Sequence, residues 1–156
     1  MLRGRLPLAR LSRLAPLLAS TEGEASVVLD FGVDDMGVRF MRGSIAADLT
    51  LVCQRCLEPM PFPVAIEIGF GLVHSEREAE QTPMAWEPLV IDTVPAVLAD
   101  IIEDELILAL PLVSTHPQES CPAGDFLKRQ AEDQQADEGE GANPFAVLSN
   151  LKRKRD

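Results

Sequence analysis

Hydrophobic and polar residues alternate in three stretches of the first half of the chain. Residues 27–33 and 45–53 alternate with a period of two, and residues 64–72 place an apolar side chain at every even position. A period of two is typical of a strand with one buried face. We therefore predict strands in these stretches and at 38–42. We expect the second and third stretches to pair as a long antiparallel hairpin covering about 45–73.

The turn of this predicted hairpin lies at 53–61 and is rich in cysteine and proline. Gly69 and Gly71 occupy polar positions of the returning strand, and glycine inside a strand is typical of a bulge or a bend. Residues 86–91 predict one more short strand, which Pro88 restricts to an edge of the sheet.

The period changes to three and four over residues 93–110, which predicts one main amphipathic helix. Asp92 is in position to cap its N-terminus, and Pro111 ends it. The residues expected on the buried face are Val94, Val97, Leu98, Ile101, Ile102, Leu106 and Ala109. The three consecutive acids Glu103, Asp104 and Glu105 are predicted on the outward, solvated arc, with an acidic docking surface for a basic partner as the alternative.

The end of the chain differs in composition from the rest. Residues 131–142 are acidic, rich in glutamine and almost free of apolar side chains, which predicts a disordered linker. Residues 143–156 then predict a short basic helix that docks on a partner or folds back onto the domain. Its apolar face and basic run consist of Phe145, Leu148, Leu151, Lys152, Arg153, Lys154 and Arg155. The fold class is thus α+β, with a mainly antiparallel sheet in a domain over residues 1–130.

The charge is unevenly distributed. The chain of 156 residues has a net charge of −11, but residues 1–13 carry +4 and residues 152–156 carry +3, which leaves −18 between them. Such an acidic body is a poor surface for wrapping nucleic acid. The longest uncharged stretch, residues 106–118, is too short to span a membrane. Three cysteines do not make a disulfide framework, and a cytoplasmic protein is predicted.

Cys53 and Cys56 form a C-x2-C pair in the predicted turn. Zinc sites use this spacing because a tight turn brings two thiolates to one metal. His116 and Cys121 follow the predicted helix and complete a possible Cys3His set. Such a zinc would be structural, since four protein ligands leave no open position for substrate. A redox dithiol and inert, packed thiols remain the alternatives.

The sequence does not predict an enzyme. It contains no glycine-rich phosphate loop and no nucleophile elbow. Three consecutive acids on a helix spread over roughly 200° and cannot converge on one reacting group. Paired carboxylates for acid–base catalysis are therefore not expected.

Three blocks of the sequence together resemble a known family. Cys53-Gln54-Arg55-Cys56 with Pro59 resembles the CQRC-x2-P signature of the YceD-type large ribosomal RNA accumulation proteins. The run from Glu103 to Val113, followed by His116 and Cys121, is similar to their second block. The third block is Asn143–Leu148 with Leu151–Lys154, and Leu6-Pro7-Leu8 is similar to the family's opening. A short acidic linker before the tail is the one departure.

The resemblance implies a bacterial cytoplasmic protein needed for the synthesis, processing or stability of 23S ribosomal RNA, and it carries over no catalytic residue or metal assignment. We expect a non-catalytic ribosome-biogenesis factor that binds the large-subunit precursor, or a basic ribosomal or rRNA-processing protein. The alternative is a zinc-containing module that binds 23S rRNA directly, and a nuclease or RNA-modifying enzyme is the least favoured. The expected contact residues in the domain are Arg39, Arg42 and Arg55, which would act together with the basic tail.

Overall fold

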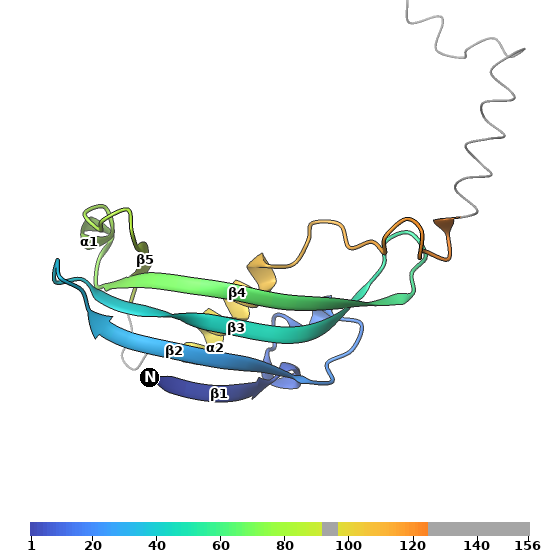
Figure 1. The fold of residues 1–156 in the computed structure, drawn as a ribbon, viewed down its shortest axis with the longest axis horizontal. Coiled ribbons are helices and arrows are strands. Elements are labelled where there is room, and N and C mark those ends of the chain that lie inside the picture. The colour runs from blue at the N-terminus through green and yellow to red at the C-terminus, as the bar shows by residue number, and fades with distance from the viewer. Residues whose placement is uncertain (92–96, 125–156) are drawn as a thin grey trace, which may run out of the picture. The chain divides into compact units, whose positions relative to one another are not determined.

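The computed structural model describes residues 1–91 and 97–124, and their main feature is one five-stranded sheet (Figure 1). The strands follow the order β1-β2-β3-β4-β5. Their bounds are Leu2–Pro7, Glu24–Val33, Arg39–Val52, Pro59–Val73 and Glu87–Val90. Strands β1 to β4 pair antiparallel, and β5 pairs parallel with β4. The predicted α+β class with a mainly antiparallel sheet is confirmed.

The helices are few. Two short 3-10 helices, η1 (Leu8–Arg10) and η2 (Ala15–Leu17), follow β1. A single-turn helix α1 (Glu76–Ala79) precedes β5, and the main helix α2 covers Leu98–Leu108. The predicted helix over 93–110 is thus confirmed in its main part. Its expected cap, Asp92, lies outside the described residues.

The predicted hairpin is confirmed and is longer than expected. The stretches 38–42 and 45–53 belong to one continuous strand, β3, whose register with β4 runs unbroken from Phe40 opposite Gly71 to Val52 opposite Pro59. Residues facing the core alternate along both strands, as the period of two predicted. On β3 the large apolar residues of that parity are buried, and on β4 they are buried or half-buried.

Of the bulge or bend predicted at Gly69 and Gly71, the bulge is wrong, because the register continues through both. Gly71 makes room for Trp86, since a Cβ at position 71 would lie 3.2 Å from the Trp86 Cβ. The Trp86 ring stacks on Phe40 with ring centroids 4.8 Å apart, and its indole N–H donates to Asp34 Oδ2 at 2.8 Å. This stack fastens the segment before β5 to the sheet.

One face of the sheet carries the hydrophobic core. Strands β2 to β4, helix α2 and the η1–η2 segment contribute to one buried cluster, and the half-buried Leu6 of β1 packs against it. Its largest fully buried side chains are Leu8, Leu11, Leu14, Leu29, Met41, Ile45, Leu49 and Leu106. Burial of each such side chain contributes about 1.5–3 kcal/mol. In Figure 1, α2 crosses behind the strands on this face.

The predicted solvated position of Glu103 is wrong. Its side chain is 5% exposed and binds the segment after η1. The Arg13 and Leu14 backbone N–H groups donate to Glu103 Oε1 at 2.6 and 3.0 Å, and Arg13 Nε donates to Oε2 at 3.1 Å. Arg13 also reaches Asp104 Oδ1 at 2.5 Å. We call these four residues the N-terminal junction; of the three acids in a row, Asp104 is exposed and Glu105 half-buried.

The carboxyl group of Glu103 is held ionised by this junction. Burial acts to raise its pKa, but the N–H groups of Leu14 and Arg13 and the Arg13 guanidinium outweigh burial and lower the pKa. Helix α2 is therefore attached to the N-terminal segment by a charged group inside the fold. The helical period of α2 does not predict the burial of Glu103, because the segment around Arg13 that covers it lies 90 residues earlier in the chain.

The chain divides into two compact units, Met1–His116 and Pro117–Asp156. The described part of the second unit contains tight turns, in which Gly124 N–H donates to the Cys121 carbonyl at 2.7 Å. The predicted linker and basic helix at 131–142 and 143–156 lie outside the described residues and stay predictions. Among the described residues, no helix combines the length and apolar character needed to cross a membrane.

Candidate metal centre

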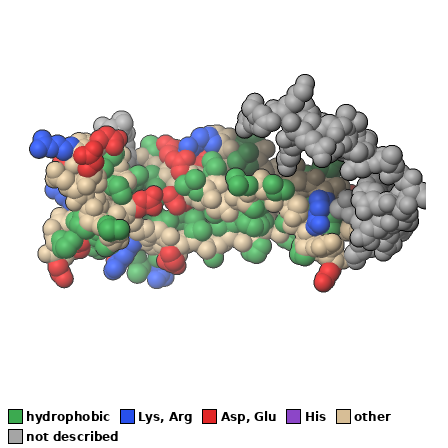
Figure 2. Space-filling model, turned by 90° about the horizontal axis from the view of Figure 1, so that it is seen from above, with side chains coloured by type: hydrophobic (Ala, Val, Ile, Leu, Met, Phe, Trp, Pro, Cys, Tyr) green, Lys and Arg blue, Asp and Glu red, His purple; other side chains and the backbone are tan. Residues whose placement is uncertain are grey.

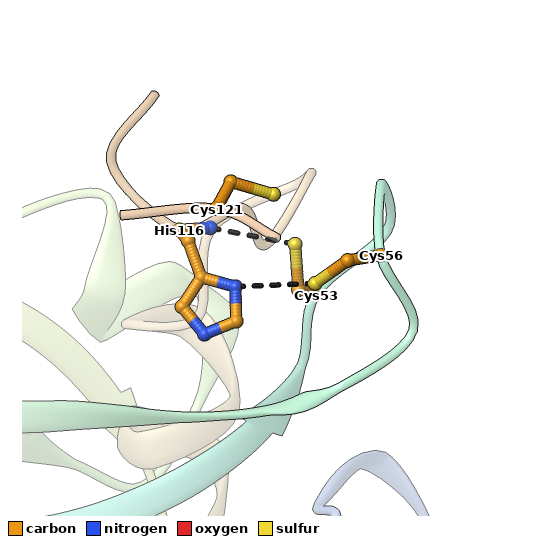
Figure 3. Close-up of side chains that lie close together, drawn as sticks. All are labelled: Cys53, Cys56, His116 and Cys121. Atoms are coloured by element: carbon orange, nitrogen blue, oxygen red, sulfur yellow. Dashed lines mark hydrogen bonds between the residues drawn. The ribbon is translucent and has the colours of Figure 1, made fainter. Parts of the chain in front are cut away.

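The C-x2-C pair lies in the turn that joins β3 to β4. Cys53 N–H donates to the Glu58 carbonyl at 3.0 Å, and Leu57 N–H donates to the Cys53 carbonyl at 2.9 Å. Closing the turn requires a left-handed backbone at Leu57, with φ of 63°. The turn therefore places both cysteine side chains on the same side of the hairpin tip (Figure 3).

The segment that follows α2 runs back to this tip. Gln54 N–H donates to the Ser114 carbonyl at 2.8 Å, and the Arg55 guanidinium donates to the His116 carbonyl. His116 is thereby positioned beside the cysteines. Its backbone N–H donates to Cys53 Sγ at 3.4 Å, and its Nδ1 lies 3.4 Å from Cys56 Sγ.

The ligand atoms of Cys53, Cys56, His116 and Cys121 all lie within 4.8 Å of one another. We call this group the cysteine cluster. Cys53 and Cys121 are buried, and Cys56 and His116 are half-buried. Figure 3 shows the four side chains directed toward one another. The structure thus brings together all four residues that the sequence predicted as metal ligands.

The electrostatics of Cys53 favour a thiolate. Burial acts to raise its pKa, but the backbone N–H groups of Cys56, His116 and Arg55 and the Cys56 side chain outweigh burial and lower the pKa to about 5. A thiolate rather than a thiol is the form that binds metal.

The donor set fits zinc. Tetrahedral zinc with Zn–S bonds of about 2.3 Å holds its ligand atoms roughly 3.5–4 Å apart. The 3.4 Å separation of Cys56 Sγ and His116 Nδ1 is close to that spacing, as expected since a Zn–N bond is shorter than a Zn–S bond. Four protein ligands would leave no position for water or substrate, so the cluster can cross-link segments and does not suit hydrolysis.

The predicted contact residues are not gathered in one place. Arg39 and Arg42 are exposed at the start of β3, where Arg42 pairs with Asp30 at 3.4 Å and lies over the Phe40 ring. Arg55 lies beyond the other end of the same strand, and its guanidinium is engaged with His116. An RNA contact by Arg55 would compete with that bond. The tail residues from Phe145 to Arg155 lie outside the described residues.

Two features of the tip were not predicted from the sequence. One is the role of Arg55, which holds the His116 segment, and its Nε is buried without a hydrogen-bond partner among the described residues. The other is Leu57, a non-glycine residue in the left-handed region. Neither leaves a signal in residue spacing, because both depend on how the hairpin tip closes.

Two comparisons with known proteins give the same family description. The profile of the family described as large ribosomal RNA subunit accumulation protein YceD matches residues 41–152. A protein of Haemophilus influenzae with the same description is 36% identical over 147 residues, which cover 93% of this chain and 83% of that protein. No solved structure shows a significant match.

Proposed function

Because the chain belongs to the YceD family of large ribosomal RNA subunit accumulation proteins, we propose that it supports accumulation of 23S rRNA in the bacterial cytoplasm. The observation that carries this proposal is the similarity over nearly the whole chain to a relative with that description. The chain acts without catalysis, by binding the large-subunit precursor or a basic ribosomal or rRNA-processing protein. The acidic body and basic tail of the sequence support a binding role.

A deletion strain tests the proposal directly. We expect 23S rRNA to fall relative to 16S rRNA in the deletion strain, and to recover when the full chain is supplied. Purified chain incubated with precursor rRNA, with and without divalent metals, is expected to leave the RNA intact. An unchanged ratio of 23S to 16S rRNA in the deletion strain would contradict the function, and cleavage of the RNA would contradict the non-catalytic role.

We propose further that the cysteine cluster holds one structural zinc. The support is the donor set of three sulfurs and one imidazole within 4.8 Å, together with the lowered Cys53 pKa. When bound, the metal would supply a cross-link between the hairpin tip and the segment after α2. Elemental analysis of purified full chain is expected to find one zinc per chain. Less than a tenth of that after growth in zinc-supplemented medium would contradict the proposal.

A second candidate is direct binding of 23S rRNA by the tail together with Arg39 and Arg42. The observation in its favour is the run of four basic residues Lys152–Arg155. Neutralising that run would reduce the salt dependence of RNA binding by up to about four phosphate contacts. Ultraviolet crosslinking in growing cells separates the two candidates. Crosslinks in one region of 23S precursor favour direct binding, and a co-purifying protein with little crosslinked RNA favours the adaptor role.

A further inference from the structure

Charge divides the first unit of the chain into two unequal parts. Residues 1–55, which form β1 to β3, hold six acidic and seven basic side chains. Residues 56–116, which include β4, β5 and α2, hold 11 acidic side chains and only Arg77 as a basic one. The negative charge of the first unit therefore comes entirely from the second part, and a basic partner would be attracted there.

Within this acidic part lies a group of exposed, large apolar side chains. Leu108 ends α2, and Leu112 and Val113 follow it with most of their surface exposed. Leu57 at the hairpin tip is 72% exposed, and its turn neighbour Gln54 bonds to Ser114 in the same segment. We call Leu57, Leu108, Leu112 and Val113 the apolar patch. Clustered apolar surface of this kind marks interaction sites more often than isolated exposed residues do.

Leu57 adds a second, independent observation. It is the only non-glycine residue with positive φ among the described residues, and this conformation costs about 1–2 kcal/mol for a residue with a Cβ. A glycine would close the same turn without that cost. The turn itself therefore does not favour a leucine at this position, where its side chain is left largely exposed.

The charges around the patch indicate the chemistry of the partner. Glu58 follows Leu57, and Asp100 lies on α2 about two turns before Leu108, where its backbone carbonyl accepts from the Arg13 guanidinium at 3.0 Å. Both are exposed, and within residues 1–91 and 97–124 neither side chain has an ion-pair partner. Figure 2 shows hydrophobic and uncharged surface across the middle of one face of the molecule, with both acidic and basic side chains beside it.

We propose that the apolar patch docks a basic amphipathic segment of a partner protein, whose lysines or arginines face Glu58 and Asp100. An apolar patch inside an acidic surface excludes RNA as the favoured ligand, because phosphates would be repelled. The inference rests on the proposed function, which requires a partner, and it names where and by what chemistry a protein partner binds.

Site-specific photocrosslinking in growing cells tests the proposal. Benzoylphenylalanine replaces Leu112 in the full chain and, as a matched control, replaces Met84, which is equally exposed at the other end of the sheet. We expect the position 112 probe to crosslink a segment of another protein that combines apolar residues with lysine or arginine, and position 84 not to. Crosslinks to RNA, to this chain's own tail, to a second copy or to an acidic segment would overturn the proposal, as would no excess over position 84.

Paired substitutions then measure the contribution of the patch. Leu112→Ser with Val113→Ser is compared with Met84→Ser with Val33→Ser, because the two pairs match in exposure at 105% and 64%. The probe is a synthetic peptide that copies the crosslinked segment. We expect about ten-fold weaker binding for the first pair, no change for the second, and unchanged thermal midpoints for both. Equal affinities would overturn the proposal.

The 23S rRNA level separates failure of this surface from failure of the function. If deletion of the chain leaves 23S rRNA unchanged, the proposed function fails, whatever the crosslinks show. If deletion lowers 23S rRNA but the patch variant restores it fully, the docking surface fails and the function stands. We expect the patch variant to restore less than the control variant.

Discussion

The N-terminal junction and the cysteine cluster solve the same problem with different chemistry. Each fastens the α2 region to a distant segment: Glu103 to Arg13, and His116 to the hairpin tip at Cys53. The junction is closed by a carboxylate, two backbone N–H groups and a guanidinium that the chain itself provides. The cluster brings together donor atoms that suit a zinc ion.

This difference separates what folding requires from what a bound metal adds. The junction is anchored in the main core, where Leu14 and Leu106 are fully buried. The cluster lies at the end of a long hairpin, outside that core. We therefore expect the sheet and α2 to fold without metal, and the tip and the segment after α2 to take their final form only with it.

Removing the metal gives the largest expected effect, and it acts on the cysteine cluster but not on the N-terminal junction. Cys53→Ser leaves three ligands, and structural zinc sites hold on the order of 10 kcal/mol of apparent binding free energy in zinc-finger peptides. We expect zinc content to fall to near zero, and hydrogen exchange to accelerate at residues 53–58 and 112–116. Amides of β2 and of β3 before Thr50 are expected to keep their protection.

Addition of a strong chelator to the wild-type chain provides the matched control for Cys53→Ser. It is expected to reproduce the exchange pattern of the variant. Loss of protection throughout the sheet would contradict the separation between the cluster and the core.

Glu103→Ala tests the N-terminal junction. It leaves the Arg13 and Leu14 N–H groups without their acceptor and breaks a buried charged contact, so the free energy of unfolding should fall by about 3 kcal/mol. Urea unfolding at pH 7 measures the loss. Zinc content is expected to stay at one per chain, and Asp104→Ala, at the exposed neighbour, is expected to cost less than about 1 kcal/mol.

Acidification gives a smaller, graded effect on the junction. The pKa of Glu103 is lower in the folded chain than in the unfolded one, so the unfolded state binds the proton more tightly. The stability from this group is complete above its unfolded pKa and is lost as pH falls through the folded pKa. Glu103→Gln should flatten the fall in unfolding free energy below about pH 4.5. If the slope of the unfolding free energy against pH is unchanged in the variant, groups other than Glu103 dominate the acid sensitivity.

The smallest expected effect concerns Arg55. Arg55→Lys keeps a positive charge but loses the planar donor that reaches the His116 carbonyl, which is worth about 1 kcal/mol. We expect zinc to be released to a chelator a few times faster, with unchanged sheet stability. Arg42→Lys, at the far end of β3, is the control and should leave zinc release unchanged. Equal release rates for both variants would remove Arg55 from the positioning of His116.

The strands were predictable because the sheet has one covered face. The alternation over 45–53 and 64–72 arises because one face of each strand is buried, and strands β3 and β4 include these stretches. Strand β1 was not predicted: Leu2 and Leu6 alternate with Arg3 and Arg5, but the stretch is short and, at the sheet edge, mostly exposed. The N-terminal leucines enter the core at positions 8, 11 and 14, a spacing that a run of leucine and arginine does not single out.

The site was predictable as far as its ligand types and no further. The C-x2-C spacing indicates a tight turn, and His116 with Cys121 supplies the remaining soft donors, which the structure brings together. The burial of Glu103 was unpredictable, because a helical period describes only the face toward the sheet. The role of Arg55 depends on a contact 61 residues away, and no local pattern encodes it.

The stack of Trp86 on Phe40 gives the chain a built-in optical reporter. Trp86 is its only tryptophan, and it has no tyrosine, so near-ultraviolet absorbance and emission come almost entirely from this one ring. The ring lies where β5 begins, at the opposite end of β4 from the cysteines. Trp86 emission therefore reports the attachment of the β5 segment and does not report changes at the hairpin tip. The two ends of the sheet can thus be followed separately in an unlabelled sample.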